Sequence, residues 1–473
     1  MGLWSALFLE NWKRVENIKA MEWGTTGYEQ EEQERPQFVG EKVISPIHGK
    51  LETYYPRFKR FITSTFTCSV VMVLVWIVIG VIACIFAIRI LISKSGFTVA
   101  GYDISSVVAS LLISLQIQFL NSFFTDVAIE LNNAENHRTD TTYEDALISK
   151  TFCFQFVNSF ASLFYIAFVK PFIPTLDACL GGNCMSELQA TLGTIFLTRL
   201  AIGNLTELGI PLMKSYFEES KRTKVAANNQ LKQRNAYRQH SDTTNGVEMH
   251  VSTSATTSRP ISFHAMTNSM ISVDEEETLK AKTEMSEIEK AFVMPVYDVM
   301  LGPFDDYAEM VIQFGYTTMF VAAFPLATVL SLVNNYVEIR VDGWKLCHLC
   351  RRPEPRTCED IGTWYFILET ISYSSIFINA GLIAFTGTNA TNDTWVERVW
   401  MFILIATGLF CIRIFVAYLI PDLPPSVEIQ LQRQDYIVDK VINNVEDEDD
   451  SHLAKNNFGI PNYLINLTDD DPM

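Results

Sequence analysis

Residues 66–93 read FTCSVVMVLVWIVIGVIACIFAIRILIS and carry a single charge, Arg89, near the end of the stretch. A helix of this length can cross a hydrocarbon core that is about 30 Å thick. Seven further stretches are candidate spans: 104–130, 150–172, 188–217, 305–322, 323–346, 361–386 and 395–420. The pattern predicts an all-α fold, a polytopic membrane helical bundle with about eight transmembrane helices.

The overall composition is less decisive than the distribution. The chain has 473 residues, of which 48% are hydrophobic, and soluble domains reach a similar fraction. The net charge of −18 comes mostly from acidic runs outside the candidate spans, and such runs are usually solvated tails or linkers. We therefore assign these runs no role and expect no nucleic-acid partner.

Charges that flank the spans predict the orientation. Basic residues gather at 57–60, 221–224 and 345–356, and all three segments fall on one side if eight spans alternate. Because basic loops favour the cytosol, we expect that side to be cytosolic. The opposite side would carry two glycosylation acceptors and two cysteines that can form a disulfide, namely Asn389, Asn392, Cys179 and Cys184.

We expect an integral protein of the plasma membrane or an endomembrane. The predicted topology divides the chain into five parts: a cytosolic N-terminal segment (1–60), spans one to four with a polar groove (61–218), a largely disordered cytosolic linker (219–303), spans five to eight with calcium-binding acids (304–421), and a cytosolic helix with an acidic tail (422–473).

Acidic side chains within the candidate spans are the main functional signal. A carboxylate at bilayer depth costs roughly 2.5–3.5 kcal/mol, so such residues are functional candidates by default. They stand in helical register at Glu207, Asp306, Glu309, Glu338 and Asp342, with Asn334 on the face of the last two. Hard oxygen ligands from several helices favour calcium over zinc, iron or copper. In the alternative interpretation, these acids pair with Arg199 and Arg340 or lie in water at the span ends.

Polar residues also form stripes along three consecutive spans. They recur at steps of three or four residues and so lie on one face of each helix: Ser110, Ser114, Gln118, Asn121 and Thr125; Thr151, Gln155, Asn158 and Ser162; and Glu187, Thr191, Thr194 and Thr198. We expect these stripes to line a permeation path, and the alternative is interhelical hydrogen bonding. Gly203, Gly209 and Pro211 in the fourth span are candidate hinge residues or merely tolerated small residues.

No plausible HExxH, GxSxG, P-loop or GxGxxG motif is present, so we do not expect an enzyme. Long strings do resemble the anoctamins, a family of calcium-activated chloride channels and calcium-activated phospholipid scramblases. The strings are LWSALFLENWKR, YEDALISKTFCFQFVNSFASLFYIAFVK, ELGIP, DDYAEMVIQFGYTTMFVAAFPLA, NNYVEIRVD and DIGTWYFIL.

The resemblance implies a homodimer of ten-helix subunits, each with its own groove and a site for two Ca²⁺ ions. The family's ligands fall on the five acids above and Asn334. One ligand position differs, because an asparagine of the family is replaced by Gly203 here, with Asn204 as a neighbouring substitute. Members also begin with a cytosolic domain and two spans that precede LWSALFLENWKR, so we expect this chain to hold eight of ten helices.

The resemblance leaves channel and scramblase as alternatives. The chloride-channel members carry a lysine at the position of Gln155, and an uncharged groove suits zwitterionic phospholipid head groups. A channel for chloride or other small ions would prefer fixed positive charge, for which Lys170 and Arg199 are the candidates. We favour a scramblase with a non-selective ion leak. A non-transporting tether or regulatory subunit that dimerises with full-length relatives is a further possibility.

Overall fold

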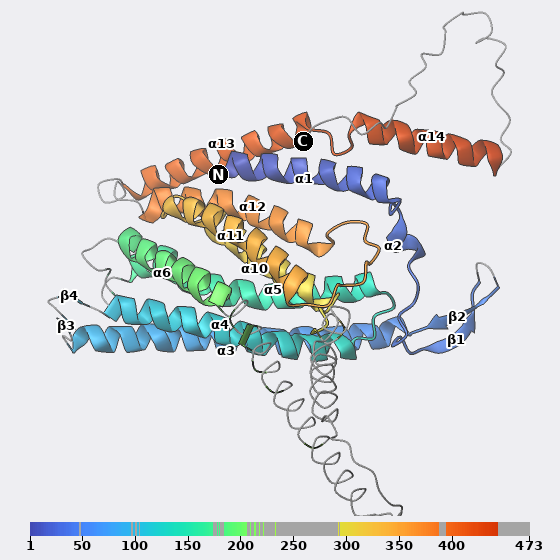
Figure 1. Cartoon of the computed structure of the whole chain (residues 1–473). Helices are drawn as coiled ribbons and strands as arrows, with labels where there is room; N and C mark the ends of the chain where they lie inside the picture. The colour runs from blue at the N-terminus through green and yellow to red at the C-terminus, as the bar shows by residue number, and fades with distance from the viewer. Residues whose placement is uncertain are drawn as a thin grey trace, which may run out of the picture.

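The computed structural model describes residues 1–46, 49–95, 98–99, 102–103, 105–173, 184–205, 294–386 and 394–442, with a few single positions between 177 and 292. Long helices lie side by side in one bundle (Figure 1). Each predicted span corresponds to a helix: α3 (Arg57–Lys94), α4 (Ser105–Ala134), α5 (Asp140–Phe164), α6 (Cys184–Asn204), α10 (Leu301–Met319), α11 (Leu326–His348), α12 (Thr363–Gly381) and α13 (Trp395–Leu419). The predicted all-α membrane fold is confirmed.

Shorter elements complete the described chain. The helices α1 (Gly2–Trp23), α2 (Tyr28–Glu31) and α14 (Pro425–Val441) lie outside the predicted spans. Turns of other helical types prolong α5 as η1 (Tyr165–Val169) and η2 (Lys170–Phe172), and α12 as η5 (Leu382–Thr386). Two antiparallel hairpins pair β1 (Glu41–Ile44) with β2 (Leu51–Tyr54), and β3 (Thr98–Val99) with β4 (Tyr102–Asp103).

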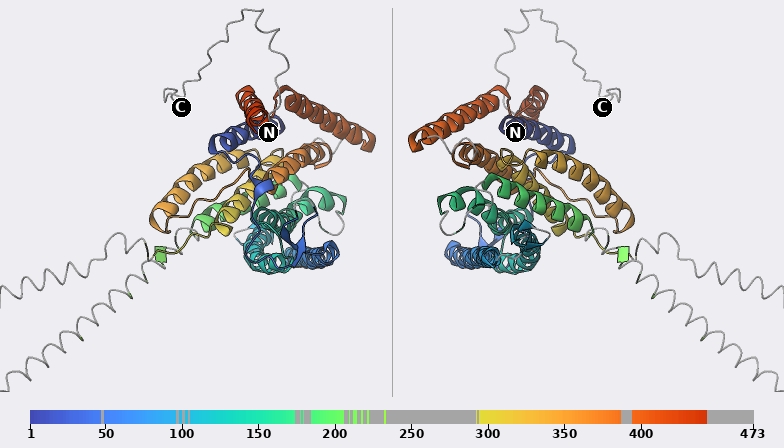
Figure 2. Two further views of the ribbon diagram at one scale, coloured as in Figure 1. Left: turned by 90° about the vertical axis from the view of Figure 1, so that its right-hand side faces the viewer. Right: turned by 90° about the vertical axis from the view of Figure 1, so that its left-hand side faces the viewer.

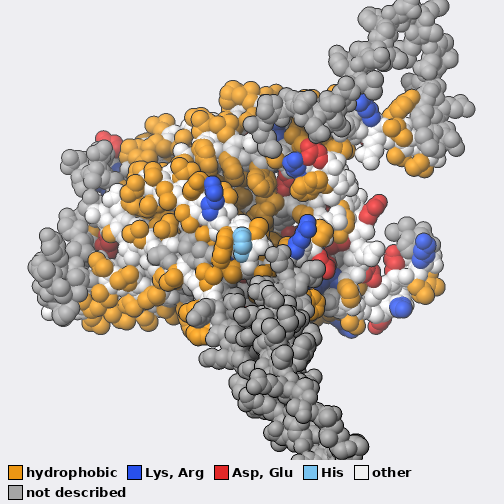
Figure 3. All heavy atoms as spheres, in the orientation of Figure 1, with side chains coloured by type: hydrophobic (Ala, Val, Ile, Leu, Met, Phe, Trp, Pro, Cys, Tyr) orange, Lys and Arg blue, Asp and Glu red, His pale blue; other side chains and the backbone are white. Residues whose placement is uncertain are grey.

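Five of these helices are long and apolar enough to cross a membrane: α3, α4, α5 with its extension, α12 with its extension, and α13. The polar residues that mark the candidate site fall on α6, α10 and α11 instead. In Figure 3, hydrophobic side chains cover much of the visible bundle surface, and charged side chains gather toward the right-hand end. Such an extended apolar surface matches a hydrocarbon environment, and the chain is an integral membrane protein.

Different connections and hairpins lie at the two ends of the bundle. The β1–β2 hairpin lies at one end in Figure 1, and the connections α4–α5 and α11–α12 lie at the same end. We call it the hairpin end. The β3–β4 hairpin lies at the opposite end, where the Cys179–Cys184 disulfide precedes α6, and we call this the disulfide end. The alternation agrees with the predicted order of loops, and the assignment of the hairpin end to the cytosol stays a prediction.

Aromatic rings hold the groups of helices together. The rings of Phe124 on α4 and Phe154 on α5 are stacked with centroids 3.9 Å apart, and Phe160 on α5 lies 4.7 Å from Tyr316 on α10. The end-on views in Figure 2 show α3, α4 and α5 grouped on one side of the bundle, with α1 and α13 on the other. Helix α11 packs mainly on α6 and α10, so its outer face stays exposed.

Helix α1 packs against α12 and α13. The hydroxyl of Ser5 lies 2.7 Å from that of Ser372, to which Arg413 Nη1 donates a hydrogen bond of 2.7 Å. Ser372 is in the middle of α12, so the beginning of α1 lies beside the middle of a candidate span. This packing was not predicted from the sequence, and the cytosolic position of residues 1–60 stays a prediction.

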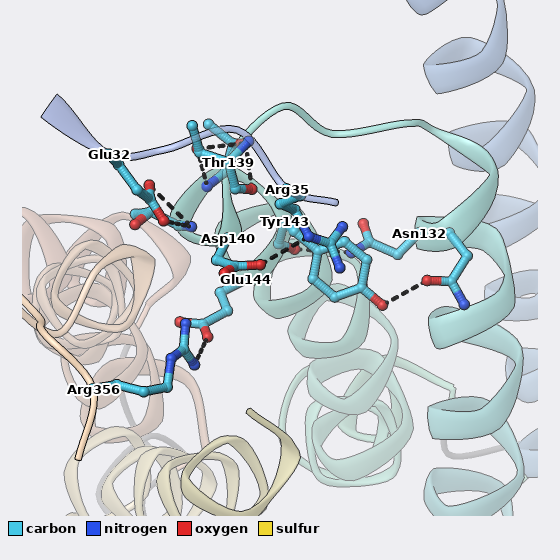
Figure 4. Close-up of polar contacts among 11 residues, drawn as sticks. Glu32, Arg35, Asn132, Thr139, Asp140, Tyr143, Glu144 and Arg356 are labelled. Carbon is cyan, nitrogen blue, oxygen red and sulfur yellow. Dashed lines mark hydrogen bonds and ion pairs between the residues drawn. The ribbon is translucent and has the colours of Figure 1, made fainter. Parts of the chain in front are cut away.

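Polar contacts fix the base of α5 at the hairpin end (Figure 4). The Glu32 carboxylate accepts a hydrogen bond from a backbone N–H in the first turn of α5, and Arg35 Nε donates to Asp140 Oδ1 at 2.8 Å. One turn later, Arg356 from the α11–α12 connection donates to Glu144. The base of α5 is therefore tied both to the segment after α1 and to the connection that follows α11.

A second polar contact joins α3, α4 and α5 at the same end. The Glu135 carboxylate, just after α4, accepts hydrogen bonds from Thr67 on α3 and Lys150 on α5, and His137 lies 2.9 Å away. Burial alone would raise the pKa of Glu135, but these three neighbours outweigh it and lower the pKa to about 2. The carboxylate is thus held in its charged form.

Candidate metal centre

The acids predicted from the sequence lie on facing helices where the structure describes them. Asp306 and Glu309 are on α10, and Asn334, Glu338 and Asp342 follow one face of the neighbouring α11. The side chains of Asn334 and Glu338 are buried, with 5% of each residue exposed. Glu207, Pro211 and the side chain of Asn204 fall outside the described residues, as do the acceptors Asn389 and Asn392.

Near the hairpin end, a lysine bridges one carboxylate from each helix. Lys345 Nζ lies 2.8 Å from Asp342 Oδ1 and 3.4 Å from Asp306 Oδ1, and the Tyr297 hydroxyl donates to Asp306 Oδ2 at 3.1 Å. We call these four residues the shallow cluster. The positive charge of Lys345 offsets the repulsion that two neighbouring carboxylates would otherwise suffer.

Further along the helices, a small cavity lies between α6, α10 and α11. Its polar lining is Arg199, Glu309, Gln313 and Asn334, which we call the deep cluster, and its apolar lining includes Tyr316. Asn334 Nδ2 donates to Gln313 Oε1 at 2.8 Å. The Asn334 Oδ1 atom is buried and has no hydrogen-bond partner among the described residues. An oxygen that is buried without a partner is a ready ligand for a cation.

Glu309 faces helix α6 at the position where the resemblance implies an additional ligand. A Cβ atom built on Gly203 would lie 3.6 Å from Glu309 Oε1, which is ordinary van der Waals contact. Because glycine has no side chain, it offers no side-chain oxygen there. The Glu309 carboxylate lies beside this position of α6, and Arg199 stands one turn earlier on the same helix.

The donor types fit calcium, since every candidate ligand binds through oxygen. Within the ranges that the structure describes, however, no three His, Cys, Asp or Glu side chains gather closely enough to hold an ion. The contacts instead place Asp306 and Asp342 in the shallow cluster with Lys345, and Glu309 and Asn334 in the deep cluster, whose cavity Arg199 also lines. Glu338 is buried on α11 and belongs to neither cluster. The meeting of all these acids at one point, including Glu207, stays a prediction.

The polar stripes contact one another across helices. Ser110 and Thr191 hydroxyls lie 3.1 Å apart between α4 and α6, and Asn158 Nδ2 donates to Asn121 Oδ1 at 2.7 Å between α5 and α4. In this conformation these stripe residues act as interhelical hydrogen-bond partners, as the alternative interpretation expected. The remaining members are found within the same helices: Ser114, Gln118, Thr125, Thr151, Gln155, Ser162, Thr194 and Thr198.

Lys170, a candidate for fixed positive charge in a groove, is buried beside two carboxylates in this conformation. The residue is 0% exposed, and its Nζ atom lies 2.7 Å from both carboxylate oxygens of Glu187 and 3.3 Å from Asp177. Arg89 Nη1 lies 3.1 Å from Asp177, and its Nη2 lies 3.0 Å from Glu187. Two cations and two anions thus neutralise one another. Glu187 likewise belongs to this buried ion cluster.

The two candidate partners named for the acids also have different neighbours. Arg340 lies over the Tyr336 ring of its own helix, with its guanidinium carbon 5.3 Å from the centroid. Arg199, in contrast, borders the cavity that Glu309 lines. Cys179 and Cys184 form a disulfide with Cα atoms 5.0 Å apart, and Cys184 is the first residue of α6. Gly203 belongs to α6, and the hinge role of Gly203 and Gly209 stays a prediction.

Comparison with known proteins identifies the family. The family model described as "Anoctamin: Calcium-activated chloride channel" matches residues 1–434. The chain belongs to the anoctamin family. Human Anoctamin-7 and mouse Anoctamin-4 are each 30% identical over 82% of this chain, which corresponds to 38% of each relative. Mouse Anoctamin-7 is 28% identical over 93% of this chain and 54% of its own length. This anoctamin chain therefore spans about two-fifths to a half of the length of these relatives.

Sequence reasoning missed several polar partners at the site. Lys345 and Tyr297 complete the shallow cluster, and Gln313 belongs to the deep cluster through its bond with Asn334. Lys345 could have been found, because it stands three residues after Asp342 on one helix face. Tyr297 precedes α10 in a connection, and no local pattern predicts where its hydroxyl points.

Proposed function

We propose that this anoctamin chain functions as a calcium-activated phospholipid scramblase with an associated non-selective ion conductance. The observation that carries the proposal is the placement of acids on the neighbouring helices α10 and α11, where Asp306 and Asp342 share Lys345 and where Glu338 and Asn334 are buried. Bound calcium would supply positive charge to carboxylates that repel one another. The candidate ligands are Glu207, Asp306, Glu309, Asn334, Glu338 and Asp342, with Asn204 as a further candidate.

The residues around the site explain how an ion could bias helix positions. Asp306 and Asp342 come from different helices and share Lys345, so any change in their charge balance alters the contact of α10 with α11. Glu309 lies against Gly203, so a shift of this carboxylate would be transmitted to α6. Two helix arrangements with different ion contacts are what a ligand needs to shift a population. Movement of α6 would then separate the Ser110–Thr191 contact and open a polar path beside α4.

The charges near this path favour phospholipids over chloride. Gln155 is neutral and buried on α5, and Lys170 is neutralised by Glu187 and Asp177. Few free positive charges therefore remain along the described stripes to attract an anion. Polar, uncharged side chains suit a zwitterionic head group that slides past while its acyl tails stay in lipid.

Two alternatives remain as proposals. The family description favours a calcium-activated chloride channel, and a non-transporting tether or regulatory subunit is the second alternative. We also propose a homodimer in which the hairpin end, the 219–303 segment and the C-terminus face the cytosol of the plasma membrane or an endomembrane.

One experiment separates these functions. The purified chain is reconstituted into liposomes, and fluorescent-lipid flipping and chloride efflux are measured in parallel, with and without calcium. We expect calcium to accelerate lipid flipping strongly. Chloride efflux without lipid flipping would favour the channel, and the absence of both with correctly inserted protein would favour the tether. Empty liposomes and liposomes with an unrelated helical membrane protein are the controls.

A further inference from the structure

Arg199 has an unusual position for a charged residue on a bundle helix. It lies on α6 and lines the same small cavity as Glu309 and Asn334. Its Nη1 atom is buried and has no hydrogen-bond partner among the described residues, and its guanidinium carbon lies 5.7 Å from the centroid of the Tyr316 ring. Aromatic contact stabilises a cation only modestly, and the carboxylate that lines the same cavity is that of Glu309.

The same helix face lacks an oxygen one turn later. Residues 199 and 203 are four apart and so lie on one face of α6. At residue 203 the chain has glycine, and Glu309 Oε1 lies 3.6 Å from where a Cβ atom would stand. The deep cluster has therefore lost a potential calcium ligand and contains a permanent positive charge. Both changes disfavour a divalent cation at this level.

The charge balance leads to the same result. The four predicted acids that the structure describes, Asp306, Glu309, Glu338 and Asp342, bring four negative charges, and Arg199 and Lys345 bring two positive charges. One Ca²⁺ ion would make this group neutral, whereas two ions would leave it with two positive charges. A site that is already partly neutralised by resident cations needs fewer mobile ones.

We propose that Arg199 is a resident counter-cation of Glu309 that takes the place of one calcium ion. The inference rests on the proposed calcium-gated function and refines it: this chain binds one Ca²⁺ ion, through the acids of α10 and α11 nearer the hairpin end. Arg199 is a positioning residue, since it acts on the site through Glu309 and Asn334. Its cavity lies between α6, α10 and α11.

The test counts calcium ions directly. Radioactive calcium is equilibrated with the purified full chain in detergent, and bound ions are counted per chain. We expect about one ion for the parent protein and for the charge-preserving Arg199→Lys. We expect about two for Arg199→Gln combined with Gly203→Asn, which removes the cation and returns an oxygen ligand. A shape-matched control, Arg340→Gln, changes an arginine outside the cavity and should leave the count at one.

The outcomes separate this inference from the proposed function. Two ions on the parent protein, or one ion on a folded Arg199→Gln/Gly203→Asn variant, would overturn the role of Arg199 and leave calcium gating intact. No calcium on any variant would instead overturn the proposed function. The parent protein alone decides the first point, so the test holds even if the double variant does not fold.

Discussion

Replacement of Lys170 by methionine probes the buried ion cluster at the disulfide end. Lys170 is fully buried and contacts both oxygens of Glu187 at 2.7 Å, with Asp177 at 3.3 Å. In Lys170→Met, only Arg89 remains to balance two buried carboxylates. Loss of one partner of a buried ion pair typically costs about 3–5 kcal/mol, because an uncompensated charge stays behind. We expect a loss of that size in the free energy of unfolding.

The double variant Lys170→Met/Glu187→Met provides the decisive comparison. It removes one cation and one anion and leaves Arg89 paired with Asp177, 3.1 Å away. Replacement of a whole buried pair by apolar residues is often close to neutral, so the double variant should lose less than half as much as the single one. Unfolding is followed in mixed detergent micelles, with Lys94→Met as an exposed control. A single variant as stable as the parent, or a double variant that loses as much as the single one, would refute the reasoning.

Three further predictions concern packing, pH and the base of α5. Gly315→Ala would place a Cβ atom 2.6 Å from a phenyl ring carbon of α5 and should lower the free energy of unfolding by about 1–3 kcal/mol, whereas Gly408→Ala meets no atom within 4 Å and should be nearly neutral. Because the pKa of Glu135 is lowered on folding, its contribution to stability should be present above pH 4.5 and should disappear as the pH falls toward 2. The difference in stability between the parent and Glu135→Gln, measured by thermal unfolding, should shrink over that range. Arg356→Glu should increase hydrogen exchange at the first turns of α5, and the charge-reversed pair with Glu144→Arg should restore protection; unchanged exchange in both variants would contradict this contact.

The helices of the bundle could be predicted from the sequence because five of them have a long apolar run, and the other three have shorter apolar stretches that contain polar residues. The boundaries are less exact. Helix α3 begins at Arg57, nine residues before the predicted start. The charged turns between Arg57 and the apolar run are helical, and Pro56 is the N-cap residue of the helix. Helix α1 was not predicted to pack on α12 and α13, because the contact of Ser5 with Ser372 joins residues that are 367 positions apart.

The acids of the candidate site could also be predicted, because a charge in an apolar stretch stands out. Their partners could not. Arg199 and Glu309 are more than one hundred residues apart, and only the packing of α6 on α10 and α11 brings them to one cavity. The ion-pair partners of Lys170 could not be predicted for the same reason, since Glu187 and Arg89 of the buried ion cluster come from other elements. Spacing in the sequence shows which residues share a helix face, but which residues from distant segments meet depends on tertiary packing.

Calcium titration of lipid flipping tests the central claim most directly. Flipping is measured in liposomes over a range of calcium concentrations for the parent and for Glu338→Gln, which keeps the size of a buried residue on α11 and removes its charge. We predict that the variant needs at least about tenfold more calcium for half-maximal flipping, because one ligand charge is lost. Flipping that responds identically to calcium in both proteins would contradict a calcium site between α10 and α11.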